Sequence, residues 1–381
     1  MGVTMKRGQV FLAITMLAVL LVACAGSGGG VSSAARSASA PPPTSEGAPS
    51  SGQMGAGASA TGAAAPTGAP AAPAALVPLK AAYTAIATAQ AAFWLGVEGG
   101  YFHQQGLDVE LIRLDGSSRA MPALLSGDVP ISMLTGAAVA GAAAQGADVV
   151  FVASGAPNLV FQVVAAPQIT SFEELRGQPV GSTGIGSSSD FALRYALRRN
   201  GLDPERGVIS RNIAGGDAQI LAALQSGAIL ATAFAPPTDY FAVQQGFRSL
   251  ARLADWDVAY QGAGVVTTKS FIASQRDTML RFMRAYVAAV HRAKTDPAFA
   301  LGVMRQYTGI EDQGSLEWGY HQYVDAWPPA PYASPAGLQG VIDSLVPSNP
   351  DVAKVDPTTL VDSSLLEELE ASGYVAGLYG R

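Results

Sequence analysis

The sequence of 381 residues has little of several features that mark common functional classes. It contains one cysteine, so no disulfide can form within the chain. Charged residues make up only 14% of the composition, with 23 basic against 29 acidic residues, which argues against the basic surface of a nucleic-acid-binding protein. The three histidines, His103, His291 and His321, lie far apart without metal-ligand spacing. We therefore expect no nucleic-acid partner, no metal, no cofactor and no catalytic triad.

Uncharged hydrophobic runs are also scarce, and the one that matters occupies residues 10–23, shortly after Lys6 and Arg7. At about 14 residues it is short for a membrane span but suits the apolar core of a secretory signal. It ends in Leu21-Val22-Ala23-Cys24, which resembles the lipobox of bacterial lipoproteins. The sequence thus predicts a signal peptide over residues 1–23, lipidation of Cys24 and a lipid-anchored, extracytoplasmic location at the cell membrane.

Aromatic residues are absent from residues 25–78, where glycine, alanine, serine, proline and threonine prevail and only Arg36 and Glu46 are charged. Such a segment buries too little apolar surface to offset the entropy of ordering its backbone. We expect residues 24–78 to form a disordered tether between the lipid and a folded part.

From residue 79 onward, β-rich runs alternate with amphipathic segments that end at glycine. The first cycle predicts strands at 79–84, 108–114, 129–134, 148–154 and 159–165, and helices at 90–105, 117–126 and 136–145. The second cycle predicts strands at 179–182, 208–213, 229–234 and 248–253, and helices at 187–200, 217–226 and 237–245. A strand at 264–268 and a long helix at 275–295 follow, and the remainder is mostly helical.

This order predicts an α/β protein with two lobes, largely parallel sheets and two crossover strands. The first lobe is expected to hold residues 79–166 and 263–381, and the second lobe residues 167–262. A single doubly wound sheet is the alternative. In either case the ligand site is expected where the carboxyl ends of strands and the amino ends of helices face a cleft.

Several motifs carry a family resemblance. They are the stretch Leu95-Gly96-Val97-Glu98-Gly99-Gly100-Tyr101-Phe102 with Gln105-Gly106-Leu107-Asp108-Val109-Glu110, the paired helix ends Ala123–Asp128 and Leu224–Gly227, and the segment Ser171–Gly177 with Val180-Gly181. In this order and spacing they resemble the solute-binding proteins of ABC importers for nitrate, sulfonate and taurine and for thiamine precursors and riboflavin.

The resemblance implies a periplasmic-binding-protein fold of the two-crossover type, a monomer that closes on a small-molecule ligand and delivers it to an ABC transporter permease. It also raises two competing functions, an enzyme of the thiamine-pyrimidine synthase type and a structural surface lipoprotein. The synthase relatives use an active-site histidine and a cysteine-rich motif, and this sequence has neither.

The strongest candidate for ligand binding is the loop of residues 184–189, which joins a predicted strand to a predicted helix. Gly186, Ser187 and Ser188 are expected to direct backbone N–H groups and hydroxyls into the cleft, where the helix dipole favours anionic or polar groups. A role as a simple helix cap is the alternative.

Equivalent junctions supply the other candidates. In the first lobe these are Gln90, Thr135 and Gly136, and before the first crossover Asn158. In the second lobe they are Asp239 and Tyr240. The junction residues other than Asn158 could instead serve only as a cap or a helix start.

The ligand itself stays open between two classes. A planar heterocycle such as a pyrimidine or flavin would use Asp239 and Tyr240, with Tyr83 and Trp94 as stacking faces. An aliphatic sulfonate, taurine or nitrate would use the loop of residues 184–189 and a cation, for which Arg119 is the nearest candidate. We favour the organic heterocycle.

Overall fold

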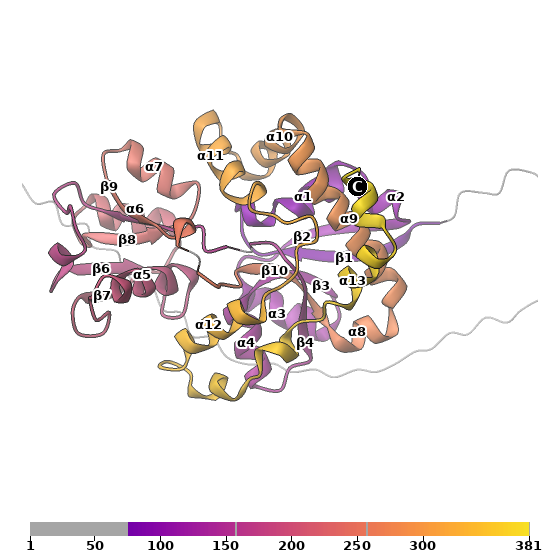
Figure 1. Ribbon diagram of the computed structural model, residues 1–381, viewed down its shortest axis with the longest axis horizontal. Coiled ribbons are helices and arrows are strands. Elements are labelled where there is room, and N and C mark those ends of the chain that lie inside the picture. Colours follow the sequence, from indigo (N-terminus) through magenta and orange to yellow (C-terminus); the bar gives the residue numbers. More distant parts are fainter. Residues whose placement is uncertain (1–74, 157, 257, 381) are drawn as a thin grey trace, which may run out of the picture. The chain divides into compact units, whose positions relative to one another are not determined.

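The computed structural model describes residues 75–156, 158–256 and 258–380, which Figure 1 shows as ribbon. The predicted signal peptide, Cys24 and nearly all of the predicted tether lie outside these residues. Among the described helices, none combines the length and the apolar character that crossing a membrane requires.

The first sheet has five strands in the order β2-β1-β3-β10-β4. Their bounds are β1 Val77–Tyr83, β2 Leu107–Arg113, β3 Ile131–Thr135, β4 Val149–Ser154 and β10 Ala263–Thr268. β1 is parallel to β2 and β3, whereas β10 is antiparallel to β3 and β4. The returning strand thus runs opposite to its neighbours, because it enters the sheet at the edge where they end.

The second sheet also has five strands, in the order β7-β6-β8-β5-β9. Their bounds are β5 Gln162–Ala165, β6 Pro179–Ser182, β7 Ile209–Asn212, β8 Ala231–Phe234 and β9 Arg248–Arg252. β6 is parallel to β7 and β8, and β5 is antiparallel to β8 and β9. Each sheet therefore contains one antiparallel strand, and in each it is the strand that arrives from the other sheet.

The chain passes between the sheets twice, once after β4 and once before β10. Asn158 in the first passage forms an isolated antiparallel bridge with Ala259 in the second. Two sheets joined in this way confirm the two-lobed α/β fold over the single doubly wound sheet. One boundary changes: β5 was expected within the first lobe, up to residue 166, but it pairs with β8 and β9 in the second sheet. An apolar β run carries no signal for its partner, so only the pairing reveals its lobe.

The helices that follow the strands begin and end close to the predicted positions. They are α1 Ala91–Glu98, α2 Tyr101–Gln104, α3 Ser117–Ser126, α4 Gly136–Ala144, α5 Ser188–Arg199, α6 Asp217–Gln225 and α7 Thr238–Gln244. The helix expected over 90–105 is split into α1 and α2 at Gly99 and Gly100. Gly100 has φ 67°, a left-handed conformation that glycine adopts without steric cost, and it breaks the helix there.

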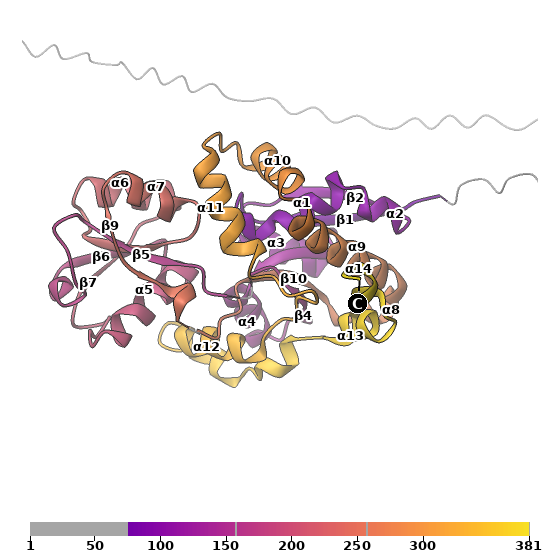
Figure 2. The same ribbon diagram turned by 45° about the horizontal axis from the view of Figure 1, so that its top comes forward.

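The chain after β10 is helical. Its main helices are α8 Lys269–Ser274, α9 Arg276–Thr295, α10 Pro297–Thr308, α11 Gln313–Val324, α12 Pro335–Leu345, α13 Ser364–Ala371 and α14 Tyr374–Leu378. α9 buries an apolar stripe that includes Met279, Phe282, Met283 and Tyr286 against α1 and α2. In Figures 1 and 2, α11 lies on the side of the first lobe that faces α7, and α12 runs beside α4.

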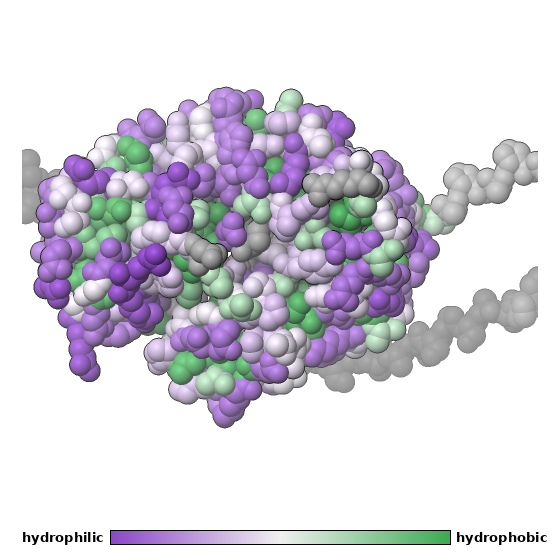
Figure 3. All heavy atoms as spheres, in the orientation of Figure 1, coloured by the Kyte–Doolittle hydropathy of each residue, from purple (hydrophilic) through white to green (hydrophobic). Residues whose placement is uncertain are grey.

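The hydrophobic core follows the two sheets. One set of clusters centres on α1, α9 and α4 with the first sheet, and another on α5 and α6 with the second. On the face drawn in Figure 3, hydrophobic residues form small groups scattered between hydrophilic ones. Most buried apolar side chains thus pack within one lobe or the other. The polar groups at the strand ends are not part of these clusters.

Candidate functional site

The main candidate is a cleft of about 320 Å³ to which both lobes contribute. The first lobe supplies Thr84, Gln90, Ser117 and Thr135, the passages supply Asn158 and Tyr260, and the second lobe supplies Phe161 and Ser188. α11 adds Tyr323. These positions follow the carboxyl ends of β1, β3 and β6 and precede the amino end of β5, the edge at which open α/β sheets bind ligands.

Helices begin around this cleft. The lining residues Gln90, Ser117, Thr135 and Ser188 stand at the amino ends of α1, α3, α4 and α5, respectively. A helix amino end carries unpaired N–H groups and the positive end of the dipole, so four such ends favour acceptor or anionic groups of a ligand. The sequence pointed to three of these junctions, those before α1, α4 and α5, and not to the junction before α3.

Ser188 and Tyr260 connect the second lobe to the second passage inside the cleft. The Tyr260 hydroxyl donates a hydrogen bond of 2.6 Å to Ser188 Oγ. Tyr260 is buried, and this burial raises the pKa of its hydroxyl to about 12. The phenol therefore stays protonated and keeps Ser188 Oγ in place. The hydroxyl proton of Ser188 remains free to be donated to a ligand.

The loop before α5 is held by hydrogen bonds to Ser187 and Asp190 at the start of that helix. The Ser187 side chain caps α5 by accepting a bond of 3.2 Å from Asp190 N. Asp190 is buried and accepts from Gly186 N at 3.0 Å, from Ser182 Oγ at 3.3 Å and from Arg194 Nε at 2.7 Å. A buried carboxylate with this many donors rigidifies the loop and so fixes the position of Ser188.

In the first lobe the polar groups of the cleft form hydrogen bonds with one another. The Ser117 hydroxyl lies 3.5 Å from Thr135 Oγ1 and accepts from Thr135 N at 3.4 Å. Thr135 Oγ1 in turn caps α4 by accepting from Ala138 N. Gln90 is buried, and its Oε1 accepts from Thr84 N at 3.4 Å, which leaves the amide N–H₂ of Gln90 available as a donor.

In the described part of the chain, the helix amino ends supply the positive potential of the cleft. Among the described residues that line it, none carries a charged side chain. The site therefore suits a neutral ligand or a small monoanion, because a multiply charged anion would lose its water without gaining a cation partner.

The structure separates the expected site residues into two groups. Gln90, Thr135, Asn158 and Ser188 come together around the cleft. Gly136, Gly186 and Ser187 stand just behind it. A side chain at Gly136 would press its Cβ to 2.5 Å from Gln261 O, and one at Gly186 would approach Leu345 Cδ2 to 2.6 Å, so both glycines allow close packing rather than line the cleft.

Asp239 and Tyr240 point to a different partner, α11. Asp239 Oδ2 accepts a bond of 3.0 Å from Trp318 Nε1, and the Tyr240 ring lies 6.0 Å from the Trp318 ring. Arg252 stands over the same indole at 5.0 Å and donates to Gln322 Oε1 at 3.3 Å. Burial raises the pKa of Asp239 to about 6, partly offset by the bond from Trp318. We call this set, Asp239, Tyr240, Arg252, Trp318 and Gln322, the α7–α11 clasp.

The aromatic and basic residues proposed for ligand contact also lie elsewhere. Trp94 is fully buried and stacks on Tyr307 at 5.0 Å, and Tyr83 packs edge-on against Trp94 at 5.8 Å. Arg119 is exposed on α3 and does not line the cleft. The stacking faces expected for a heterocycle and the cation expected for an anion are thus both absent from the described lining of the cleft.

Sequence patterns missed five of the lining residues, Thr84, Ser117, Phe161, Tyr260 and Tyr323. Tyr260 stands in the second passage, where Tyr260-Gln261-Gly262 directly precedes a strand, and this position was a detectable signal. Tyr323 lies in the aromatic-rich helix α11 far along the chain, and nothing local distinguishes it from a core residue. Its place in the cleft results from how α11 packs.

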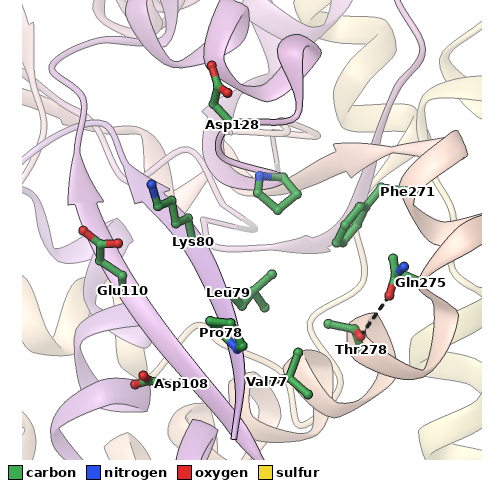
Figure 4. A pocket seen from close by; sticks show the side chains of 11 residues that line it. Val77, Pro78, Leu79, Lys80, Asp108, Glu110, Asp128, Phe271, Gln275 and Thr278 are labelled. Atoms are coloured by element: carbon green, nitrogen blue, oxygen red, sulfur yellow. Dashed lines mark hydrogen bonds between the residues drawn. The ribbon is translucent and has the colours of Figure 1, made fainter. Parts of the chain in front are cut away.

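A second hollow, of about 470 Å³, lies at the opposite edge of the first sheet. Figure 4 shows its charged side chains, Lys80, Asp108, Glu110 and Asp128, at the beginnings of β1 and β2 and before β3. This is the amino-terminal edge of the parallel strands, away from the amino ends of α1, α3, α4 and α5. The cleft, by contrast, combines four helix amino ends with lining residues from both lobes.

Comparison with known families agrees with this architecture. The NMT1/THI5-like family model matches residues 87–300, more than half of the chain. The chain belongs to the NMT1/THI5-like family. The match spans both passages and ends in α10, so α11 and the cleft residue Tyr323 lie beyond it. No curated protein sequence matches the chain.

Solved structures with the same fold include periplasmic binding proteins. The aliphatic sulphonate binding protein SsuA from Escherichia coli is 19% identical with a TM-score of 0.63, covering 75% of this chain and 92% of that one. The nitrate-binding protein NrtA from Synechocystis PCC 6803 is 14% identical with a TM-score of 0.61, covering 80% and 91%. The alkanesulfonate-binding protein SsuA from Xanthomonas axonopodis pv. citri, bound to MOPS, is 17% identical with a TM-score of 0.58, covering 77% and 98%. At these identities the likeness establishes the periplasmic-binding-protein fold.

Proposed function

We propose that this protein is the extracytoplasmic solute-binding component of an ABC importer, and that it captures a small solute in the cleft between its lobes. The observation that carries the proposal is the cleft itself: both lobes and both passages line it, and four helix amino ends surround it. Family membership and the fold shared with binding proteins of known ligand support the same conclusion.

Closure follows from where the contacts lie. A ligand held by Thr135 and Gln90 from one lobe and Ser188 from the other makes all its bonds only when the lobes are together. Binding then shifts the population toward the closed state, and a permease can respond to that state. No bond of the solute needs to break, so we propose a binding protein and not a synthase.

The histidines fit a non-catalytic role. His103 pairs with Asp108 and His321 with Asp325, both at exposed positions, and His291 packs against the Tyr379 ring. None of the three lines the cleft. A general base for a synthase reaction would have to stand within hydrogen-bond reach of the substrate.

For the ligand we propose a small monoanion of the sulfonate type, which the helix amino ends can bind without a cation. Solved proteins of the same fold that bind sulfonates and nitrate support this class. A neutral heterocycle is the second candidate, because the rings of Phe161, Tyr260 and Tyr323 and uncharged polar groups line the cleft. Tyr83, Trp94, Asp239 and Tyr240, which first suggested a heterocycle, do not.

A thermal-shift and calorimetry panel tests the function. The mature chain is titrated with alkanesulfonates, taurine, nitrate, pyrimidines and riboflavin. A ligand at about a hundredfold excess over Kd stabilises the native state by about 2.7 kcal/mol and so raises Tm by several degrees. A panel in which no compound raises Tm or releases heat contradicts the proposal.

We also propose that lipidated Cys24 tethers the protein to the membrane, on the strength of the charged start, apolar run and small residues before Cys24. Expressed with its signal in a bacterial host, the protein should fractionate with membranes, and mass spectrometry should find acyl chains on its amino-terminal peptide. The Cys24→Ser variant should appear in the soluble fraction. Equal membrane retention of both forms would contradict the anchor.

A further inference from the structure

We propose that Tyr323 on α11 contacts the solute and selects it, donating a hydrogen bond from its hydroxyl to an uncharged acceptor on the ligand. This inference rests on the proposed binding function and adds to it a residue outside the matched family region and a chemical requirement for the ligand.

The first observation is an unused donor in the cleft. Tyr323 is 5% exposed and lines the cleft, yet its hydroxyl has no hydrogen-bond partner within the described ranges 75–156, 158–256 and 258–380. The hydroxyl oxygen is also not sealed from solvent, unlike the fully buried atoms deeper in the lobes. A buried polar group normally finds a partner, because leaving it unpaired costs free energy.

Other buried tyrosines show what a purely structural phenol does here. Tyr286 donates to Ser154 O at 3.0 Å, and Tyr320, one turn before Tyr323 on the same helix, donates to Ala293 O at 2.7 Å. Tyr260 donates to Ser188 Oγ. Tyr323 is as deeply buried as these residues, and its hydroxyl is directed to no protein acceptor. A bound molecule in the cleft can supply that acceptor.

The electrostatic surroundings define which acceptor fits. Burial and the nearby carboxyl groups of Asp239 on α7 and Asp217 on α6 raise the pKa of Tyr323, so the phenol keeps its proton and acts as a donor. The same carboxyl groups disfavour an anionic oxygen at this end of the cleft. A hydroxyl, ether, amide or carbonyl oxygen satisfies Tyr323, whereas an ammonium group cannot accept its proton.

The ligand is thus expected to have two different ends. An acidic or strongly polar end lies at the helix amino ends of α3, α4 and α5, and an uncharged acceptor lies at α11. α11 also carries Trp318 and Gln322 of the α7–α11 clasp. The helix that would contact the ligand is therefore also the helix that is hydrogen-bonded to the second lobe.

The test compares Tyr323→Phe with Tyr320→Phe in the mature chain. Without any ligand, Tyr323→Phe should leave Tm unchanged or raise it, since the lost hydroxyl has no partner, whereas Tyr320→Phe should lower Tm because Ala293 O loses its donor. If Tyr323→Phe lowers Tm as much as Tyr320→Phe does, the hydroxyl is structural and the inference is overturned.

The second arm uses 2-hydroxyethanesulfonate, which carries an uncharged acceptor, and ethanesulfonate, which does not. Tyr323→Phe should weaken binding of the first probe about tenfold and leave the second within about twofold, and Tyr320→Phe should change neither. Equal effects of Tyr323→Phe on both probes would contradict the selective role. Failure of the unmodified chain to bind any compound of the wider panel would count against the binding function, while the ligand-free comparison would still decide whether the hydroxyl is structural.

Discussion

Two strand-to-helix junctions of the second lobe, at residues 183–188 and 235–240, begin from the same local pattern and serve different purposes. Both follow a short buried strand, β6 or β8, and both place polar groups where a helix begins. At the first junction Ser188 reaches the cleft and meets Tyr260. At the second junction Asp239 and Tyr240 meet Trp318 of α11.

The difference arises from what packs against each junction. The second passage runs past the first junction and leaves Ser188 open to the cleft, whereas α11 covers the second junction and takes up its polar groups. A buried carboxyl with an indole N–H partner suits a contact that holds two elements together. The same local sequence pattern can therefore make a ligand site or a clasp.

The largest expected effect tests the clasp through Trp318→Ala. The substitution removes the donor to Asp239, the surface under Arg252 and the ring beside Tyr240. Because Trp318 is partly exposed, we expect a loss of about 2–4 kcal/mol from the free energy of unfolding, measured by urea denaturation. The free energy of unfolding of Trp318→Phe, which keeps a ring but loses the N–H, should lie between those of the unmodified chain and Trp318→Ala. A loss below about 0.5 kcal/mol for Trp318→Ala would mean that the clasp does not hold the lobes.

The pH dependence of the clasp comes next in size. The folded-state pKa of Asp239 is raised to about 6 from 3.8, mainly by burial, so the folded chain binds a proton that the unfolded chain has released. The stability that this proton supplies is complete below about pH 4 and is lost as pH rises through about 6, an effect of about 2–3 kcal/mol.

Asp239→Asn should flatten this part of the profile, measured by urea denaturation between pH 4 and pH 8. The matched control is Asp343→Asn, which changes an exposed carboxylate on α12 and should retain the full pH slope. An unchanged slope in Asp239→Asn would show that another group titrates in this range.

The smallest effects separate two adjacent serines at the first junction. Ser187→Ala removes the cap of α5 and should cost about 1 kcal/mol of stability while leaving ligand affinity within about twofold. Ser188→Ala removes the partner of Tyr260 in the cleft and should weaken binding about five- to tenfold, measured by calorimetry with the best compound of the panel. The reverse pattern would exchange the roles of cap and ligand contact.

Much of the fold could be predicted because it depends on local periodicity. The helix at Ser117–Ser126 and the strands at Pro179–Ser182 and Ala263–Thr268 stand within a residue of their predicted bounds. The pattern failed where pairing decides the outcome: β5 belongs to the second sheet, although its apolar run would suit either one. Local sequence sets strand character, and hydrogen bonding to distant strands sets the partner.

For the candidate site, the sequence indicated the junctions but not which of their side chains line the cleft. Thr135 and Ser188 follow from the rule that ligands bind at the carboxyl ends of strands. Tyr323 could not be selected in this way, because a late helix carries no local mark of the cleft, and Tyr260 is indicated only by its position directly before a strand. Only tertiary contacts bring them there.

By itself the sequence determined the two βα cycles and the order in which they appear, since each depends on residues adjacent in the chain, and it led to the proposal of a lipid anchor at Cys24. The tertiary structure decided that the junction at Ser188 faces the cleft and that the junction at Asp239 packs against α11. The reason is physical: the amino end of a helix offers the same donors at every junction, and the element packed against it determines whether those donors meet a ligand or the protein itself.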